Sequence, residues 1–145
     1  MLWNVATWAV FKTIRVLHSG CVNHLTFSPD GRLIREAGRR GGIRFWDTVT
    51  GALVKTFGLE GDKILSRSGP YYNDVAFSPD ERLLVTADGS EPVRLYNAVT
   101  GAMIETLMHD GGSVSVAFSP DGRLLATGGS DGGITLWNAL PEAVV

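Results

Sequence analysis

The sequence predicts an all-β fold assembled from repeats of one four-stranded antiparallel unit, and two recurring patterns predict it. A six-residue phrase, Phe-Ser-Pro-Asp-Gly/Glu-Arg, occurs three times in the 145 residues, at 27–32, 77–82 and 118–123. An aromatic residue followed by a polar one occurs four times, at Trp3-Asn4, Trp46-Asp47, Tyr96-Asn97 and Trp137-Asn138. Successive aromatics of these pairs are 43, 50 and 41 residues apart. These intervals lie in or near the period of a four-stranded propeller blade, with one insertion in the middle unit.

The third repeat shows the sequence pattern expected for the three inner strands of a unit. Apolar and polar residues alternate over 114–118 and lead into a Pro-Asp-Gly turn, which is typical of a strand that ends in a tight turn. A second strand is expected over 124–128 and a third over 134–137, with a turn at 131–133 between them. Consecutive strands joined by such short turns predict a β-meander.

A fourth, outer strand is expected after each Thr-Gly turn. The segments 51–57 and 101–107 have this form, and Lys12-Thr13-Ile14 near the start aligns with their ends. The expected organisation is therefore one domain over 1–145, which divides into an outer strand at 8–17, repeat one at 18–57, repeat two at 58–107 with an insertion at 58–73, and repeat three at 108–138. This count gives twelve strands, or three four-stranded units whose ends are offset by one strand.

Composition narrows the classes of protein. The chain is 44% hydrophobic and 19% charged, with a net charge of −2, so it can bury a core and lacks the positive field that nucleic acid binding needs. We expect no membrane span and no signal peptide, because the apolar start is interrupted by Asn4 and Thr7 and has no basic region before it. Cys21 is the only cysteine, so an intrachain disulfide is impossible and a cytoplasmic location is expected. Motifs for phosphate, zinc or dinucleotide binding are missing, and we expect no cofactor and no metal site.

Over nearly its whole length the chain resembles the WD-repeat β-propeller family. The resemblance rests on Phe-Ser-Pro-Asp, on the Thr-Gly turn and on the run from Leu125 to Trp137. It implies a partial propeller, and it implies that a blade can carry a hydrogen-bonded tetrad of His, Ser or Thr, Asp and Trp. In the third repeat the matching residues are His109, Thr127, Asp131 and Trp137.

The first two repeats depart from the tetrad pattern. The first has Glu36 and Arg40 where the resemblance calls for Ser and Asp, and the second has Ser68 and Ser90 at the His and Asp positions. We expect these blades to be less rigidly cross-tied. The residue types of the third tetrad also suit a nucleophilic triad, but the structural role explains their spacing better.

Three blades are fewer than the four to eight of a usual ring. Either copies of the chain close a ring, with six blades in a dimer or nine in a trimer, or the chain is part of a longer propeller. An unpaired strand edge at each end favours association.

The resemblance implies that binding takes place on one rim, called the top. Candidate partner-binding residues on this rim combine charge with aromatic groups, and they are Arg39, Arg40, Lys63, Arg67, Tyr71, Tyr72 and Glu91. Strand alternation predicts that Arg35 and Arg44 are exposed. This basic cluster either attracts an acidic segment or phosphate, or is a solvated surface with Glu36 and Asp47 as local counter-charges. The rim insertion is either a contact surface or a solvated loop.

The function that these features favour is a non-catalytic scaffold that binds a protein or peptide. The alternative is a regulatory or structural module of a longer protein, such as a kinase or a nucleotide-binding regulator. An enzyme with a site at the mouth of the central channel of a propeller has the weakest support, because a fold by itself does not indicate a catalytic activity.

Overall fold

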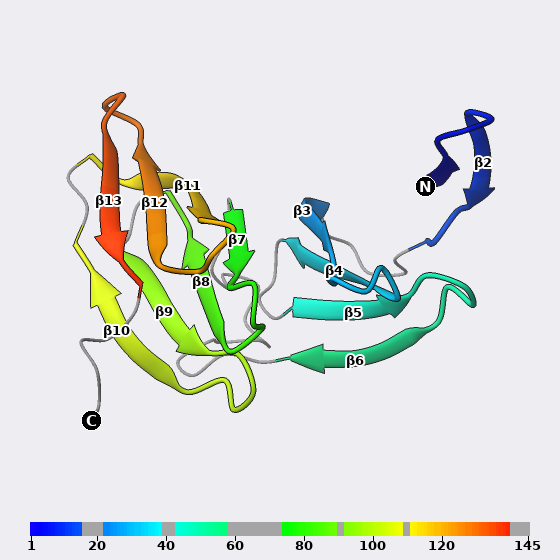
Figure 1. The fold of residues 1–145 in the computed structure, drawn as a ribbon, viewed down its shortest axis with the longest axis horizontal. Helices are drawn as coiled ribbons and strands as arrows, with labels where there is room; N and C mark the ends of the chain where they lie inside the picture. The colour runs from blue at the N-terminus through cyan, green and yellow to red at the C-terminus, as the bar shows by residue number, and fades with distance from the viewer. Residues whose placement is uncertain (16–21, 39–42, 58–73, 90–91, 109–110, 140–145) are drawn as a thin grey trace.

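The computed structural model describes residues 1–15, 22–38, 43–57, 74–89, 92–108 and 111–139, and the regular structure within them is entirely β (Figure 1). The strands form two four-stranded sheets, one three-stranded sheet and one two-stranded sheet, all antiparallel. Among the described residues, no helix is long and apolar enough to cross a membrane.

Each larger sheet is a meander of consecutive strands, which we call blades 1, 2 and 3. Blade 1 consists of β3 (Val22–Phe27), β4 (Leu33–Gly38), β5 (Ile43–Asp47) and β6 (Leu53–Phe57). Blade 2 consists of β7 (Asp74–Phe77), β8 (Leu83–Ala87), β9 (Val93–Asn97) and β10 (Met103–Leu107). Blade 3 contains β11 (Ser113–Phe118), β12 (Leu124–Gly129) and β13 (Ile134–Asn138). The three expected repeats are therefore three sheets, which confirms the all-β class and the partial propeller.

The N-terminal hairpin differs from the sequence-based expectation of a single outer strand at 8–17. It consists of β1 (Leu2–Asn4) and β2 (Ala9–Lys12), so the described residues contain thirteen strands and not twelve. The reason is local, because the Asn4 side-chain oxygen accepts hydrogen bonds from the backbone N–H groups of Ala6 and Thr7, at 2.9 and 3.1 Å. Asp47 and Asn97 close the β5–β6 and β9–β10 turns in the same way. Trp3-Asn4 therefore ends β1, just as the other aromatic-polar pairs end the third strand of blades 1, 2 and 3, so β1 corresponds to the third strand of a blade.

The repeated Ser-Pro-Asp phrase forms the turn between the first and second strands of each blade. In blade 1 the Ser28 hydroxyl donates to Asp30 at 2.5 Å and accepts from the Leu33 N–H at 3.0 Å. The Arg32 N–H donates to the same carboxylate oxygen of Asp30 at 3.0 Å. Equivalent bonds occur in blades 2 and 3. Each turn therefore satisfies its own polar groups, and these bonds lower the pKa of its aspartate below the ordinary value.

The core lies between the blades. One cluster joins blade 1 to blade 2 and comprises Ala37, Ile43, Phe45, Val75, Leu84 and Tyr96. A second joins blade 2 to blade 3 and comprises Val85, Ala87, Val93, Val116, Leu125 and Ala139. Successive residues of a strand point to opposite faces, so Leu84 faces blade 1 while Val85 faces blade 3. Blade 2 is consequently covered on both faces.

Arg35 is buried and not exposed as strand alternation predicted. Its side chain is only 5% exposed, lies over the Phe77 ring at 4.1 Å and pairs with Glu81 of blade 2. Arg44 is also mostly buried, against Glu36. The expectation was wrong because blade 2 covers the face of β4 that carries Arg35, and Glu36 pairs with Arg44 on the other face of the sheet. Alternation along a strand separates the two faces of the sheet, but it does not show which of them a neighbouring blade covers.

Glu81 explains a departure from the repeated turn. Two of the turns place glycine where the backbone has a positive φ, at Gly31 (71°) and Gly122 (72°). The third has Glu81 there, at 62°. A non-glycine residue in this conformation is strained. The carboxylate of Glu81 reaches the buried Arg35, and this ion pair between two blades offsets the strain.

Candidate functional site

The described strands define one rim, the entry rim, where β3, β7 and β11 begin and the second strand of each blade ends. The predicted partner-binding residues belong to the connections 39–42, 58–73 and 90–91, whose flanking strands begin or end at this rim. Those residues themselves lie outside the described part of the chain, and they are Arg39, Arg40, Lys63, Arg67, Tyr71, Tyr72 and Glu91.

Two members of the predicted tetrad meet in blade 3. The Trp137 indole N–H donates to the Thr127 hydroxyl at 2.9 Å, and Thr127 is fully buried. Asp131 is exposed in the β12–β13 turn, where its carboxylate accepts from the Gly133 N–H at 2.9 Å and packs against Gly111. A Cβ atom at Gly111 would lie 2.8 Å from the Asp131 carboxyl carbon, so this approach requires glycine. His109 lies outside the described residues.

Blade 1 satisfies its tryptophan by a different set of residues. Glu36, at the position equivalent to Thr127, accepts from the Trp46 indole N–H at 3.4 Å. The same carboxylate accepts two bonds from the Arg44 guanidinium, at 3.1 and 3.2 Å. In the sequence, Glu36 is a departure from the tetrad pattern, because it stands where the pattern has Ser or Thr. The structure shows that its longer side chain holds both the indole and a charge partner on the face toward β1.

Asp74 ties the three blades together along their innermost strands. One carboxylate oxygen lies 2.6 Å from Nδ1 of His24 on β3. The other accepts from the Ser115 hydroxyl and from the Val116 N–H on β11, both at 2.9 Å. His24, Asp74 and Ser115 each stand three residues before the phenylalanine of the repeated phrase. The bridge therefore links equivalent positions of three successive repeats.

This bridge was not predicted, although a sequence signal was present. Neither His24 nor Asp74 is among the sequence-predicted site residues. When the repeats are aligned on their phenylalanines, His24, Asp74 and Ser115 occupy equivalent positions. Polar residues at equivalent positions of three innermost strands indicate that these side chains meet around a common axis. Burial raises the pKa of Asp74, but the hydrogen bonds from His24, Val116 and Ser115 outweigh it and hold that pKa below its ordinary value.

Blade 3 has an uncovered apolar face. In blade 2 the side chain of Val93 is 0% exposed because blade 3 covers it, and Leu95 packs beside it. The equivalent residues of blade 3 are Ile134 and Leu136, which are 79% and 64% exposed. We call the surface made by Leu124, Ala126, Ile134 and Leu136 the open face of blade 3.

Blade 1 has a complementary surface on its opposite side. Val75 and Val116 are buried where blades 2 and 3 each receive the preceding blade, whereas their equivalent Leu25 is 58% exposed. Phe27 beside it is also exposed. The N-terminal hairpin covers this side only in part, and a cavity of about 470 Å³ remains between them.

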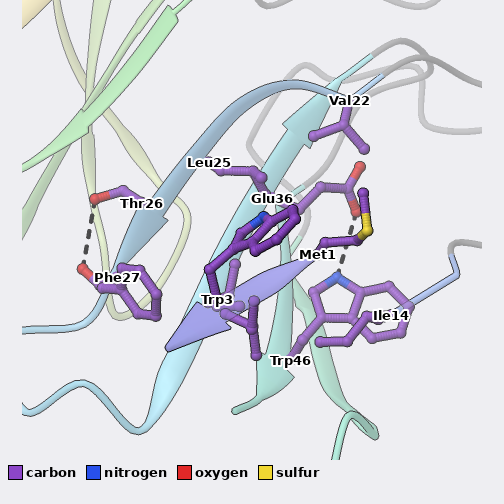
Figure 2. A pocket seen from close by; sticks show the side chains of 11 residues that line it. Met1, Trp3, Ile14, Val22, Leu25, Thr26, Phe27, Glu36 and Trp46 are labelled. Atoms are coloured by element: carbon purple, nitrogen blue, oxygen red, sulfur yellow. Dashed lines mark hydrogen bonds between the residues drawn. The ribbon is translucent and has the colours of Figure 1, made fainter. Parts of the chain in front are cut away.

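Figure 2 shows this cavity and the bond from Trp46 to Glu36. It is lined by Leu2, Trp3 and Ile14 from the hairpin side, and by side chains of β3, β4 and β5 that include Leu25, Phe27, Ile34, Glu36 and Trp46. Among the described residues, three or more His, Cys, Asp and Glu side chains do not gather in any group that could hold a metal ion.

Comparisons with known proteins agree with this architecture. The family model described as "WD domain, G-beta repeat" matches residues 11–47 and 101–138, together more than half of the chain. A curated relative, "Retinoblastoma-binding-like protein E" of Dictyostelium discoideum, is 27% identical over 75 residues, which are 52% of this chain and 14% of that protein.

Two solved structures have the same fold. They are the WD40 repeats of RRP9, at 20% identity, and U3-55K, at 21% identity, and each superposes with a TM-score of 0.69. Each match covers 88% of this chain and 38% of the solved one. The chain therefore spans well under half the length of these relatives.

Proposed function

Because the chain belongs to the WD-repeat family, whose repeats generally mediate protein–protein contacts and are generally non-catalytic scaffolds, we propose that it binds a protein or peptide partner through the entry rim. The observation that carries the proposal is the alignment of that rim. The Asp74 bridge holds the innermost strands of all three blades in one register, so the connections that precede β7 and β11 start from one side of the array. A common side lets several connections contact one partner.

The chemistry of the connections supports a polypeptide partner. The segment 58–73 contains Tyr71 and Tyr72 together with Lys63 and Arg67, and aromatic and arginine side chains dominate the energy of protein interfaces. Arg39 and Arg40 in the β4–β5 connection, and Glu91 in the β8–β9 connection, add charges of both signs for orientation and rate of encounter. We infer no role for nucleic acid or membrane, since the net charge is −2.

The experiment is a capture assay followed by identification of the partner and measurement of its affinity for the purified chain. We expect Tyr71→Ala and Tyr72→Ala to weaken binding at least tenfold with unchanged thermal stability. Val49→Ala, at the opposite rim in the β5–β6 turn, is the matched control and should leave affinity unchanged. If both tyrosine variants bind as the unchanged chain does, while Arg39→Ala or Arg40→Ala weakens binding, the contact lies at the β4–β5 connection. If none of them alters binding, the entry rim is the wrong surface.

A second candidate is a structural or regulatory module within a longer protein, and one observation favours it. Each solved relative is more than twice as long as the matched region, and the curated relative is about seven times as long. We also propose that the chain associates with itself, because the open face of blade 3 and the complementary surface of blade 1 at Leu25 and Phe27 are both exposed. We further propose a cytoplasmic location, which the single cysteine supports.

A further inference from the structure

We propose that a second copy of this chain docks its blade 3 onto blade 1, with its β13 replacing β1 beside β2. The inference rests on the proposed self-association and specifies its geometry. Both halves of the interface between blades 2 and 3 are repeated in the described residues: blade 3 carries one half, which is largely exposed, and blade 1 carries the other, which the N-terminal hairpin covers only in part. Continuity with that established interface is the reason to choose a second copy as the occupant.

The first step is the match between the two open surfaces. Between blades 2 and 3, Val85 and Val93 pack against Val116 and Leu125. The residues equivalent to the first pair in blade 3 are Ala126 and Ile134, and those equivalent to the second pair in blade 1 are Leu25 and Ile34. Burial of Ile134 and Leu25, which are 79% and 58% exposed, would remove two aliphatic side chains from water and so favours association.

The second step is the cavity. The space between β1 and blade 1 shows that the hairpin leaves part of the surface at Leu25 and Phe27 uncovered, the surface that receives the preceding blade in blades 2 and 3. Its walls are Leu25 and Phe27 on one side and Leu2 and Ile14 on the other. In the exchanged arrangement β11 and β12 of the second copy lie beside its β13 and cover this surface, as β7 and β8 lie beside β9 and cover blade 3 through Ala76 and Val85.

The third step is competition for β2. The segments Leu2-Trp3-Asn4 of β1 and Leu136-Trp137-Asn138 of β13 are identical in sequence. β1 contributes only three residues, and its register shifts between Leu2 and Trp3. β13 contributes five residues. Both strands therefore present the same residues to β2, and β13 is the longer one.

The pairing of the other outer strands shows what the exchange gains. On β10, Leu107 pairs with Val93, and on β6, Phe57 pairs with Ile43. The equivalent residue after β2 is Ile14, which lies beyond the reach of β1 and lines the cavity. In the exchanged sheet Ile134 of the second copy pairs with Ile14, and Leu136 takes the place of Leu2. Two copies joined at both ends would supply six blades, within the usual range of four to eight.

The first test is the mass of the chain by sedimentation and light scattering over a range of concentrations. We expect a dimer, and we expect removal of residues 1–4 to tighten association at least tenfold because it removes the competitor of β13. Leu136→Lys should weaken association at least tenfold with an unchanged circular dichroism spectrum. Val99→Lys is the matched control, since Val99 is equally exposed in the β9–β10 turn away from both open faces, and we expect no effect.

The second test is a cross-link in a background with Cys21→Ser. Ile14→Cys and Ile134→Cys chains, mixed and oxidised, should form a mixed disulfide dimer, because directly paired residues on adjacent strands lie within reach of a disulfide. Val54→Cys mixed with Ile134→Cys is the control, and it should give no mixed dimer. A monomer at every concentration, with no cross-link, would refute self-association itself. A dimer that resists Leu136→Lys and forms no Ile14–Ile134 cross-link would refute the strand exchange and leave self-association standing.

Discussion

Replacement of Asp74 by alanine tests whether one carboxylate holds three blades in register. The change removes both acceptor oxygens, so Nδ1 of His24, the Ser115 hydroxyl and the backbone N–H groups of Val75 and Val116 lose this partner together. Asp74 has only 15% of its side chain exposed, and His24 has 26%. Water can therefore replace some of the lost bonds, mainly at His24, and little at the backbone N–H groups.

The expected cost follows from these contacts. A buried donor left without a partner costs about 1 to 3 kcal/mol, and a hydrogen bond to a charged group contributes about 1.5 to 3 kcal/mol. With two buried backbone donors, of which Val75 is adjacent to Asp74 in the chain, and two side-chain donors that water can reach in part, we expect Asp74→Ala to lower the free energy of unfolding by about 3 kcal/mol. Asp74→Asn keeps one acceptor oxygen and loses the charge, so its cost should be about half as large.

The pH dependence has a definite sign. The hydrogen bonds hold the folded-state pKa of Asp74 below its ordinary value of 3.8, so the stabilisation is fully present above pH 3.8. It is lost as the pH falls through the lower, folded-state pKa. Asp74→Asn removes the titrating group, and we expect its stability to depend less on pH in the acid range.

Urea denaturation followed by tryptophan fluorescence measures these changes, and Glu105→Ala on the exposed outer strand β10 is the matched control. A surface substitution of this kind should alter stability by no more than about 0.5 kcal/mol. If Asp74→Ala loses no more than Glu105→Ala, the bridge contributes nothing to blade register and the reasoning fails.

Two further substitutions test how the blades are cross-tied. Glu81→Gly relieves the positive φ, worth about 1 kcal/mol, but leaves the buried Arg35 without its ion partner. Because Glu81 is 46% exposed, solvent screens this pair, and its loss should cost about 2 to 3 kcal/mol, less than the loss of a fully buried pair. We therefore expect net destabilisation by about 1 to 2 kcal/mol in urea, and a gain of stability would show that strain outweighs the pair. Thr127→Val leaves the Trp137 indole N–H without its acceptor and should cost about 1 to 2 kcal/mol, whereas Thr135→Val on the exposed part of β13 should change the thermal midpoint little; equal effects of the two would contradict a specific role for the Thr127 hydroxyl.

Sequence alone determined the fold class and the presence of a repeated strand unit, because both depend on local patterns. Each Ser-Pro-Asp turn is held by hydrogen bonds among its own residues, as Ser28 and Asp30 show. The alternation of apolar and polar residues along a strand is likewise visible in one segment of sequence, without knowledge of the blade that packs against it. The bond from Trp137 to Thr127 could be predicted for the same reason, since both residues belong to one repeat and are diagonal neighbours on the paired strands β12 and β13.

Tertiary structure decided everything that depends on which blade lies next to which. Alternation along β4 separates two faces, but only the packing shows that blade 2 covers one of them and buries Arg35 there against Phe77 and Glu81. His24 and Asp74 stand 50 positions apart in the sequence, and their meeting required the innermost strands to be placed around one axis. The open faces at Leu25 and Ile134 have the same cause: a residue type specifies an apolar surface, and only the arrangement of sheets decides whether that surface is covered.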